Sequence, residues 1–150
     1  QAAILASGSS MQIYENILYS NGSGIWATQG GQNIYIYNNT IYGNTTYGIL
    51  NTTVSNMVVR NNIGYLNGTN FSPSGSEAQS NNLFGVNPRF VDPASANFNL
   101  QSGSPAIGAG ICMIDSAIPP YCSGANCDIG AKQYSAVTPL VAPINLVVGP

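Results

Sequence analysis

Side chains able to carry acid–base chemistry are few in this sequence. It holds three Lys or Arg residues, no histidine and five carboxylates. The carboxylates are Glu15, Glu77, Asp92, Asp115 and Asp128. Glycoside hydrolysis needs two carboxylates about 5–10 Å apart, whereas these five are scattered along the chain. Without histidine, Ser–His and Cys–His nucleophiles are excluded. The sequence therefore predicts no catalytic residue, no metal site and no cofactor.

The charge balance also narrows the classes of partner. The formal net charge is −2, and only 5% of the residues are charged. Such a chain offers no field for nucleic acid or an anionic membrane. No window approaches the roughly 18 consecutive apolar residues of a membrane span. The polar surface must be built from uncharged residues, of which 19 are asparagine.

Two kinds of residue suggest covalent modification. Cys112, Cys122 and Cys127 lie close together but lack zinc-ligand spacing, so one disulfide plus one odd thiol is expected, with three reduced thiols as the alternative. Six asparagines stand in Asn-x-Ser/Thr sequons, mostly in or beside expected turns where a glycan could point outward. They are Asn21, Asn38, Asn44, Asn51, Asn67 and Asn70. The alternative is an Asn/Thr-rich surface that carries no glycan.

A fixed repeat period organises the first half of the chain. Met11, Ile34 and Met57 are spaced by 23, and four further columns keep this period. These columns are Ile13, Ile36 and Val59; Asn16, Asn39 and Asn62; Tyr19, Tyr42 and Tyr65; and Asn21, Asn44 and Asn67. Within each copy apolar residues alternate with a period of two, which indicates strands. Copies too small to bury a face alone must stack, so the sequence predicts an all-β parallel β-helix with one coil per repeat.

Stacking gives each column a role. Ile13, Ile36 and Val59 are expected to lie inside. Asn16, Asn39 and Asn62 come where the chain must turn, and a hydrogen-bonded asparagine ladder is favoured there over ordinary surface turns. Alternation places a third set of side chains on the outer face of the same strands. This set, Tyr14, Tyr35, Tyr37 and Arg60, is either a contact face for sugar or another subunit, or an aromatic ladder that only stabilises the sheet.

Two irregularities are visible in the repeat. Gly24 and Gly48, which open a further strand, are spaced by 24, so one residue is inserted in the preceding turn. Residues 68–80 are polar and contain Pro73 and two glycines. They are expected to form a loop that protrudes from the third coil.

Three motifs further along resemble the C-terminal end of right-handed parallel β-helix proteins. Residues 87–93 read NPRFVDP, residues 103–110 read GSPAIGAG, and residues 128–131 read DIGA. The chain thus resembles the pectate-lyase-like superfamily and bacterial surface β-helix proteins. The resemblance implies a right-handed β-helix of three to four coils over residues 1–134, with a C-terminal cap from about residue 81 that seals its open end. The loop between the Ala-Gly and DIGA segments carries all three cysteines, which the family does not require. We predict that a Cys112–Cys127 bond closes the base of this loop and leaves Cys122 unpaired.

Two functions are compatible with these features. The first is a secreted, non-catalytic structural or adhesive module at a cell surface. Such a module would associate with copies of itself head to tail in a filament, or it would adjoin upstream coils. Carbohydrate is a further candidate partner. The alternative is the C-terminal fragment of a polysaccharide lyase or glycoside hydrolase, a class that acts on acidic polysaccharides, with its catalytic residues outside this chain. The uncharged apolar tail, residues 135–150, is expected to be either a linker or a strand that pairs with a neighbouring subunit.

Overall fold

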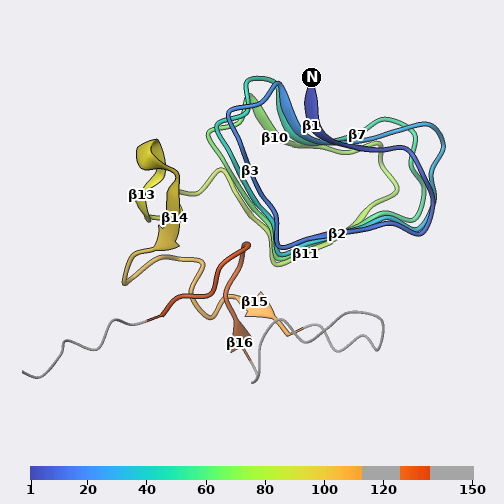
Figure 1. Ribbon diagram of the computed structural model, residues 1–150. Coiled ribbons are helices and arrows are strands. Elements are labelled where there is room, and N and C mark those ends of the chain that lie inside the picture. The colour runs from blue at the N-terminus through green and yellow to red at the C-terminus, as the bar shows by residue number, and fades with distance from the viewer. Residues whose placement is uncertain (113–125, 136–150) are drawn as a thin grey trace, which may run out of the picture.

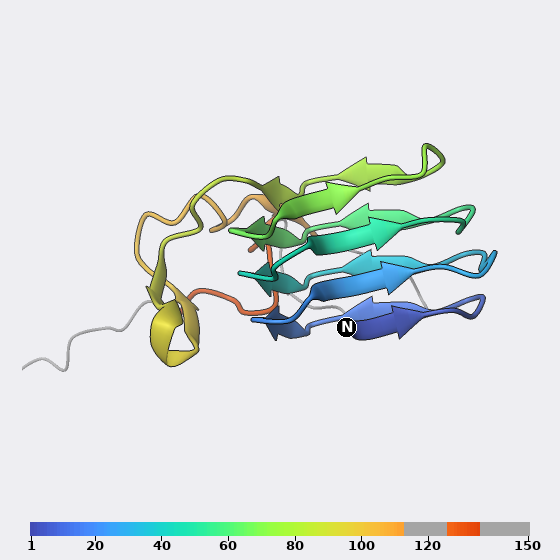
Figure 2. The ribbon, with the colours of Figure 1, turned by 90° about the horizontal axis from the view of Figure 1, so that it is seen from above.

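Four stacked coils form the body of the protein. The computed structural model describes residues 1–112 and 126–135. Each coil contributes three short strands, and the coils lie one above another as a parallel β-helix (Figures 1 and 2). In chain order the strands are β1 (Ala2–Ala6), β2 (Gln12–Tyr14), β3 (Ile17–Tyr19), β4 (Ser23–Ala27), β5 (Tyr35–Tyr37), β6 (Thr40–Tyr42), β7 (Tyr47–Asn51), β8 (Val58–Arg60), β9 (Ile63–Tyr65), β10 (Thr69–Ser72), β11 (Ala78–Ser80) and β12 (Leu83–Phe84).

Three parallel sheets run along the stack. The first sheet has the order β1-β4-β7-β10, the second β2-β5-β8-β11 and the third β3-β6-β9-β12. In the second sheet Ile13 pairs with Ile36, which pairs with Val59. This register confirms the repeat period and the predicted parallel β-helix.

The core fills the space enclosed by the three sheets. Ile36 and Val59 are fully buried, and Ile13 is nearly so. Ile34 and Met57 are also fully buried beside them, whereas Met11 in the first coil is half-buried. The inward column was therefore correctly predicted, and its burial increases from the first coil to the middle of the stack.

One turn keeps its length in every coil. Two residues connect the second-sheet strand to the third-sheet strand each time, as Glu15 and Asn16 do between β2 and β3. The left-handed residue in this turn precedes the ladder asparagine. Its four occupants are Glu15 (φ 55°), Asn38 (φ 52°), Asn61 (φ 55°) and Asn81 (φ 50°). Asparagine tolerates this region because its short polar side chain bonds locally, whereas glutamate does so less readily.

Glu15 is thus the one member of its column with an unfavourable residue type. The Glu15→Asn variant is expected to be more stable by about 0.5–1 kcal/mol, a gain of a few °C in Tm. Glu15→Gln is the matched control, since it removes the same charge without gaining tolerance of a positive φ. Thermal unfolding followed by circular dichroism checks this, and an equal gain in both variants would assign the effect to charge.

The segment expected to protrude as a loop belongs to the stack instead. Residues 69–72 form β10 on β7, and residues 78–80 form β11 on β8. Residues 68–80 were not assigned to a coil because the repeat here is shorter than the others, with Ala78 opposite Val58. The strands β10 and β11 are also largely polar, so they lack the apolar alternation of the earlier copies. Within the fourth coil, Phe71 and Phe84 pack against each other, with their ring centroids 5.8 Å apart.

Gly64 makes room for the Phe84 ring of this pair. It stands in the inward column of Leu18 and Ile41. A Cβ at this position would lie only 2.7 Å from the Phe84 ring. A larger residue would therefore push Phe84 out of the core.

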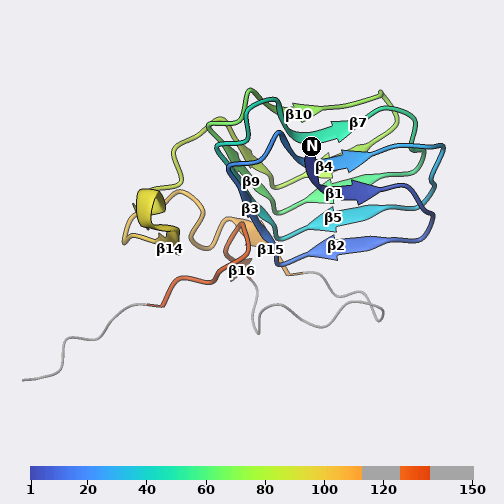
Figure 3. The same cartoon turned by 45° about the horizontal axis from the view of Figure 1, so that its top comes forward.

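The C-terminal segment lies beside the stack, against the third sheet (Figure 3). It contains an antiparallel hairpin and a short antiparallel pair. Its elements are β13 (Phe90–Asp92), the 3-10 turn η1 (Pro93–Ser95), β14 (Asn97–Leu100), β15 (Gly110–Ile111) and β16 (Asn126–Cys127). Phe98 contacts Tyr19 of the first coil at 5.0 Å and Tyr42 of the second at 5.4 Å between ring centroids.

We expected this segment to seal the end of the helix. Its described residues lie instead along the side of the stack. The outer face of the third sheet is aromatic and aliphatic, and the segment buries it. Phe90, Phe98, Leu100 and Ile129 form a second apolar cluster with Ile63. A sheet apolar on both faces needs covering on both.

No helix in residues 1–112 and 126–135 is long and apolar enough to cross a membrane. Three sequence-based expectations lie outside the described residues. They concern Asp115, Cys122 and nearly all of the tail from residue 135 to 150.

Candidate functional site

The predicted asparagine ladder is present and extends to a fourth member. The side-chain oxygen of Asn39 accepts bonds from the backbone N–H and the Nδ2 of Asn16, at 3.1 and 3.0 Å. Asn39 donates in the same way to Asn62, at 3.0 and 2.9 Å. Asn62 donates to Asn82 at 3.0 and 3.1 Å. The ladder thus holds one corner of all four coils.

Burial explains why most of the sequons cannot carry glycans in this fold, and a second asparagine ladder holds two of them inside. Asn21 donates to Asn44 Oδ1, and Asn44 donates to Asn67 Oδ1. Asn38, Asn44, Asn51 and Asn67 are all at most 9% exposed. A glycan on Nδ2 of a buried asparagine would have no space, so the expectation that these turns point outward was wrong for these four. Asn21 and Asn70 are half-buried.

The outer face of the second sheet is only partly open. Tyr14 is exposed, Tyr35 and Arg60 are half-buried, and Tyr37 is 1% exposed. The rings of Tyr14 and Tyr37 stack at 5.0 Å with 5° between their planes. The structure therefore shows a cross-coil aromatic pair here, and Tyr37 is not available to a ligand.

Each of three described carboxylates serves a structural role. Asp92 Oδ1 accepts from Ser95 N–H and begins η1. Asp128 accepts from the backbone N–H groups of Gly108 and Tyr134. The third is Glu77.

Glu77 organises the turn before β11. Its carboxylate accepts from Ser74 N–H, Gly75 N–H and Asn51 Nδ2, at 2.6, 2.9 and 2.6 Å. Burial works to raise the pKa of the Glu77 carboxyl, but these hydrogen bonds outweigh it and hold the pKa below its usual range. Because the folded-state pKa is lowered, the stabilisation is present above the ordinary carboxyl range and is lost as the pH falls through the lowered pKa.

The two cysteines expected to pair lie side by side. Cys112 Sγ and Cys127 Sγ are 2.7 Å apart. Cys112 follows β15, and Cys127 lies in β16 opposite Gly110. The arrangement brings the two sulfur atoms together, and a disulfide between them stays a prediction.

A groove of about 370 Å³ opens between the third sheet and the hairpin. We call it the tyrosine groove. Its lining residues are Tyr42, Tyr65, Leu66, Asn87, Arg89, Phe90, Pro93 and Gln101. Its volume lies at the lower end of the range of small-ligand sites, about 300–1,000 Å³. It combines flat aromatic surface with amides and one cation.

The loop before β13 fixes the position of Arg89. Asn87 Oδ1 accepts from Arg89 N–H at 2.9 Å, which holds a local turn with Arg89 at φ 54°. Arg89 Nη1 donates to Gly103 O at 3.1 Å. A Cβ at Gly103 would lie 3.3 Å from this Nη1, so glycine lets the guanidinium approach. Arginine has five N–H donors, and no described carboxylate forms an ion pair with it.

The remaining polar groups of the groove are similarly held. Gln101 Nε2 donates to Phe90 O at 2.8 Å, which leaves its side-chain oxygen as an acceptor. Tyr42 is packed by Phe90 and Phe98, whereas Tyr65 has Tyr42 as its one ring partner among the described residues. Leu66, which follows Tyr65, is 59% exposed. The Tyr65 end of the groove is therefore its open end.

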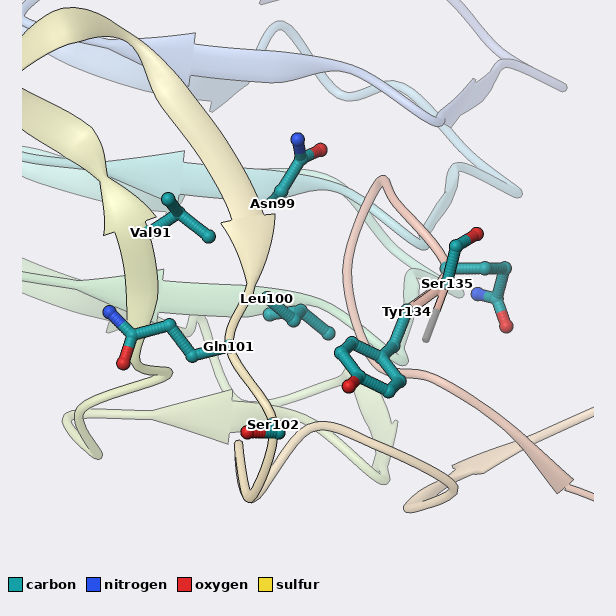
Figure 4. A pocket seen from close by; sticks show the side chains of 8 residues that line it. Val91, Asn99, Leu100, Gln101, Ser102, Tyr134 and Ser135 are labelled. Atoms are coloured by element: carbon teal, nitrogen blue, oxygen red, sulfur yellow. The ribbon is translucent and has the colours of Figure 1, made fainter. Parts of the chain in front are cut away.

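A second hollow, of about 610 Å³, lies against the other face of the same hairpin (Figure 4). Val91 and Asn99 project from the hairpin into it, and the Tyr134 ring lies near Leu100. Its edge is formed by Ser135, where the described part of the chain ends. We take the tyrosine groove as the candidate site because it combines two tyrosine rings with a cation, whereas the second hollow has one tyrosine and no cation among its lining residues.

Sequence reasoning missed this groove. The column of Tyr19, Tyr42 and Tyr65 was recognised, but not that its rings face outward under a hairpin. Arg89 was assigned to the cap. The signal available was a cation inside a turn motif, NPRF, that comes one coil after a column of tyrosines.

Comparison with protein families gives one match. The model of the right-handed beta helix region matches residues 1–129, which include the four coils and most of the C-terminal segment. Comparisons with curated proteins and with solved structures gave no match.

Proposed function

Since this chain belongs to the right-handed β-helix family, we propose that it is a non-catalytic adhesive module of an extracellular protein. In this proposal the tyrosine groove binds a carboxylate-bearing saccharide. The observation that carries it is the Arg89 guanidinium, held by Asn87 and Gly103 beside two tyrosine rings.

The groove offers the chemistry that such a ligand requires. A sugar ring presents apolar C–H faces to an aromatic surface, and Tyr65 provides one. Hydroxyl groups need both donors and acceptors, which Asn87 Nδ2 and Gln101 Oε1 supply. A carboxylate suits Arg89, because a guanidinium forms strong charge-assisted hydrogen bonds with it.

Three of the five carboxylates support a non-catalytic role. Glu77, Asp92 and Asp128 accept backbone hydrogen bonds within their own turns. Such engaged groups are poor proton donors or nucleophiles for a lyase or hydrolase. The alternative function, an enzyme fragment, would place its chemistry outside this chain.

Calorimetric titration with tetragalacturonic acid tests the proposal. We expect binding with a dissociation constant of roughly millimolar order, since one shallow site contributes limited affinity. The fully methyl-esterified tetramer keeps the rings and loses the charge, so it is expected to bind about tenfold more weakly. Cleavage of the oligomer during the titration would instead favour the enzyme alternative.

Two variants locate the site. Arg89→Gln is expected to weaken binding about tenfold, whereas Lys132→Gln removes the same charge from outside the groove and should leave it unchanged. Tyr65→Leu is expected to weaken it severalfold. Circular dichroism shows whether each variant is folded. Unchanged affinity in a folded Arg89→Gln variant would contradict the proposal.

A further inference from the structure

The two ends of the coil stack are complementary to each other. At one end, β1, β2 and β3 are the edge strands of the three sheets, and at the other end the edge strands are β10, β11 and β12. Figure 2 shows the C-terminal segment beside the stack, with the described residues leaving both end coils uncovered. Edge strands present unpaired N–H and C=O groups that can pair with another chain.

The first asparagine ladder ends with opposite groups at these two edges. Among the described residues, nothing donates to Asn16 Oδ1 in the first coil. In the fourth coil, Asn82 Oδ1 accepts from Asn62 and Asn82 Nδ2 donates to Val59 O at 2.8 Å, but the Asn82 backbone N–H has no described acceptor. At every internal step of the ladder, the backbone N–H and Nδ2 of one asparagine donate to Oδ1 of the asparagine in the next coil. Asn82 of one chain could therefore donate to Asn16 Oδ1 of another.

The end coils also match in size. From the first sheet to the second, the connection in the first coil runs from Leu5 to Gln12, and that in the fourth coil runs from Ser72 to Ala78. Both are shorter than the connections between the equivalent positions of the two middle coils. The two coils with the shortest connections between these sheets are thus those at the ends.

Apolar side chains are incompletely covered at both ends. Ile4, Met11 and Leu18 are partly buried against the core in the first coil, as are Phe71 and Phe84 in the fourth. A coil stacked on either edge would complete their burial, as each internal coil does for its neighbour.

We propose that copies of this chain associate head to tail, with the fourth coil of one copy continuing the sheets and the first asparagine ladder into the first coil of the next. The partner at each edge is a second copy. Because the two surfaces differ, the contact does not close on itself and produces a filament. This proposal is independent of saccharide binding.

Sedimentation velocity of the full chain over a range of concentrations tests the association. Met11→Lys places a cation at the first-coil edge, and Gln79→Lys places one in the inward column at the fourth-coil edge, where Gln79 is already exposed. Each variant is expected to be a folded monomer. Gln12→Lys, on the outer face next to Met11, is the matched control and should assemble like the parent chain.

Mixing the two blocked variants gives the decisive result. Met11→Lys keeps a free fourth-coil edge and Gln79→Lys keeps a free first-coil edge, so the mixture is expected to form dimers and nothing larger. Dimers of either variant by itself would indicate a symmetric contact and overturn the proposal. A parent chain that stays monomeric at all concentrations would also overturn it.

Discussion

The Ile36→Asp variant is expected to be unfolded. Ile36 is fully buried in the second sheet, with Ile13 and Val59 paired to it from the coils on either side. An ionised carboxylate there would lie among apolar side chains with no partner, and such a charge costs at least several kcal/mol. The whole free energy of unfolding of a domain is only about 5–15 kcal/mol.

Circular dichroism and soluble yield measure this outcome. Ile36→Val is the matched control, since it removes one methylene and should cost about 1 kcal/mol. A soluble Ile36→Asp variant with the spectrum and Tm of the parent chain would contradict the stacked core.

The Asn39→Ala variant is expected to lose about 3–5 kcal/mol of stability. Asn39 is fully buried, and its Nδ2 donates to Ile13 O, Tyr37 O and Asn62 Oδ1, at 2.8, 3.0 and 2.9 Å. Its Oδ1 also accepts both bonds from Asn16. Alanine would remove all of these side-chain bonds. Asn62 Oδ1 would keep the backbone N–H of residue 39 and Asn16 Nδ2 would keep Tyr14 O, but the other groups would lose this partner, and each unsatisfied buried group costs about 1–3 kcal/mol.

Asn16→Ala serves as the control within the same ladder. Asn16 is only half-buried, and its side chain donates to Tyr14 O and Asn39 Oδ1. Its loss should cost about 1 kcal/mol. Urea unfolding of both variants checks the ratio, and similar losses at the two positions would show that burial of the ladder contributes little.

The buried apolar column and the asparagine ladder could be predicted from the sequence because their residues repeat at a fixed period. The column of Ile13, Ile36 and Val59 and the ladder of Asn16, Asn39 and Asn62 keep one residue type or class at a fixed period. The fourth coil could not be found in this way. Gln79, which pairs with Val59, comes earlier than the period requires and is polar, so both the period and the apolar signal fail there.

Other features depend on contacts between segments far apart in the sequence. The Tyr42 ring is covered by Phe90 and Phe98, and no periodicity in the coils indicates that a hairpin will pack on them. The burial of Asn38 and Asn44 was also missed, because their sequons suggest surface turns. The tyrosine groove exists only once the hairpin is in place, so the position of Arg89 one coil after the tyrosine column did not by itself reveal it.

The hairpin packed along the side of the stack also changes how the protein can come apart. In a simple solenoid each coil touches only its neighbours, so the end coils can open one at a time. Here Phe98 contacts Tyr19 of the first coil, and the same apolar cluster includes Leu83 of the fourth. The first coil cannot peel away without breaking a contact made by a residue that comes much later in the chain. These long-range contacts couple the opening of all four coils, so hydrogen exchange at the two ends of the stack is tied to a single cooperative event.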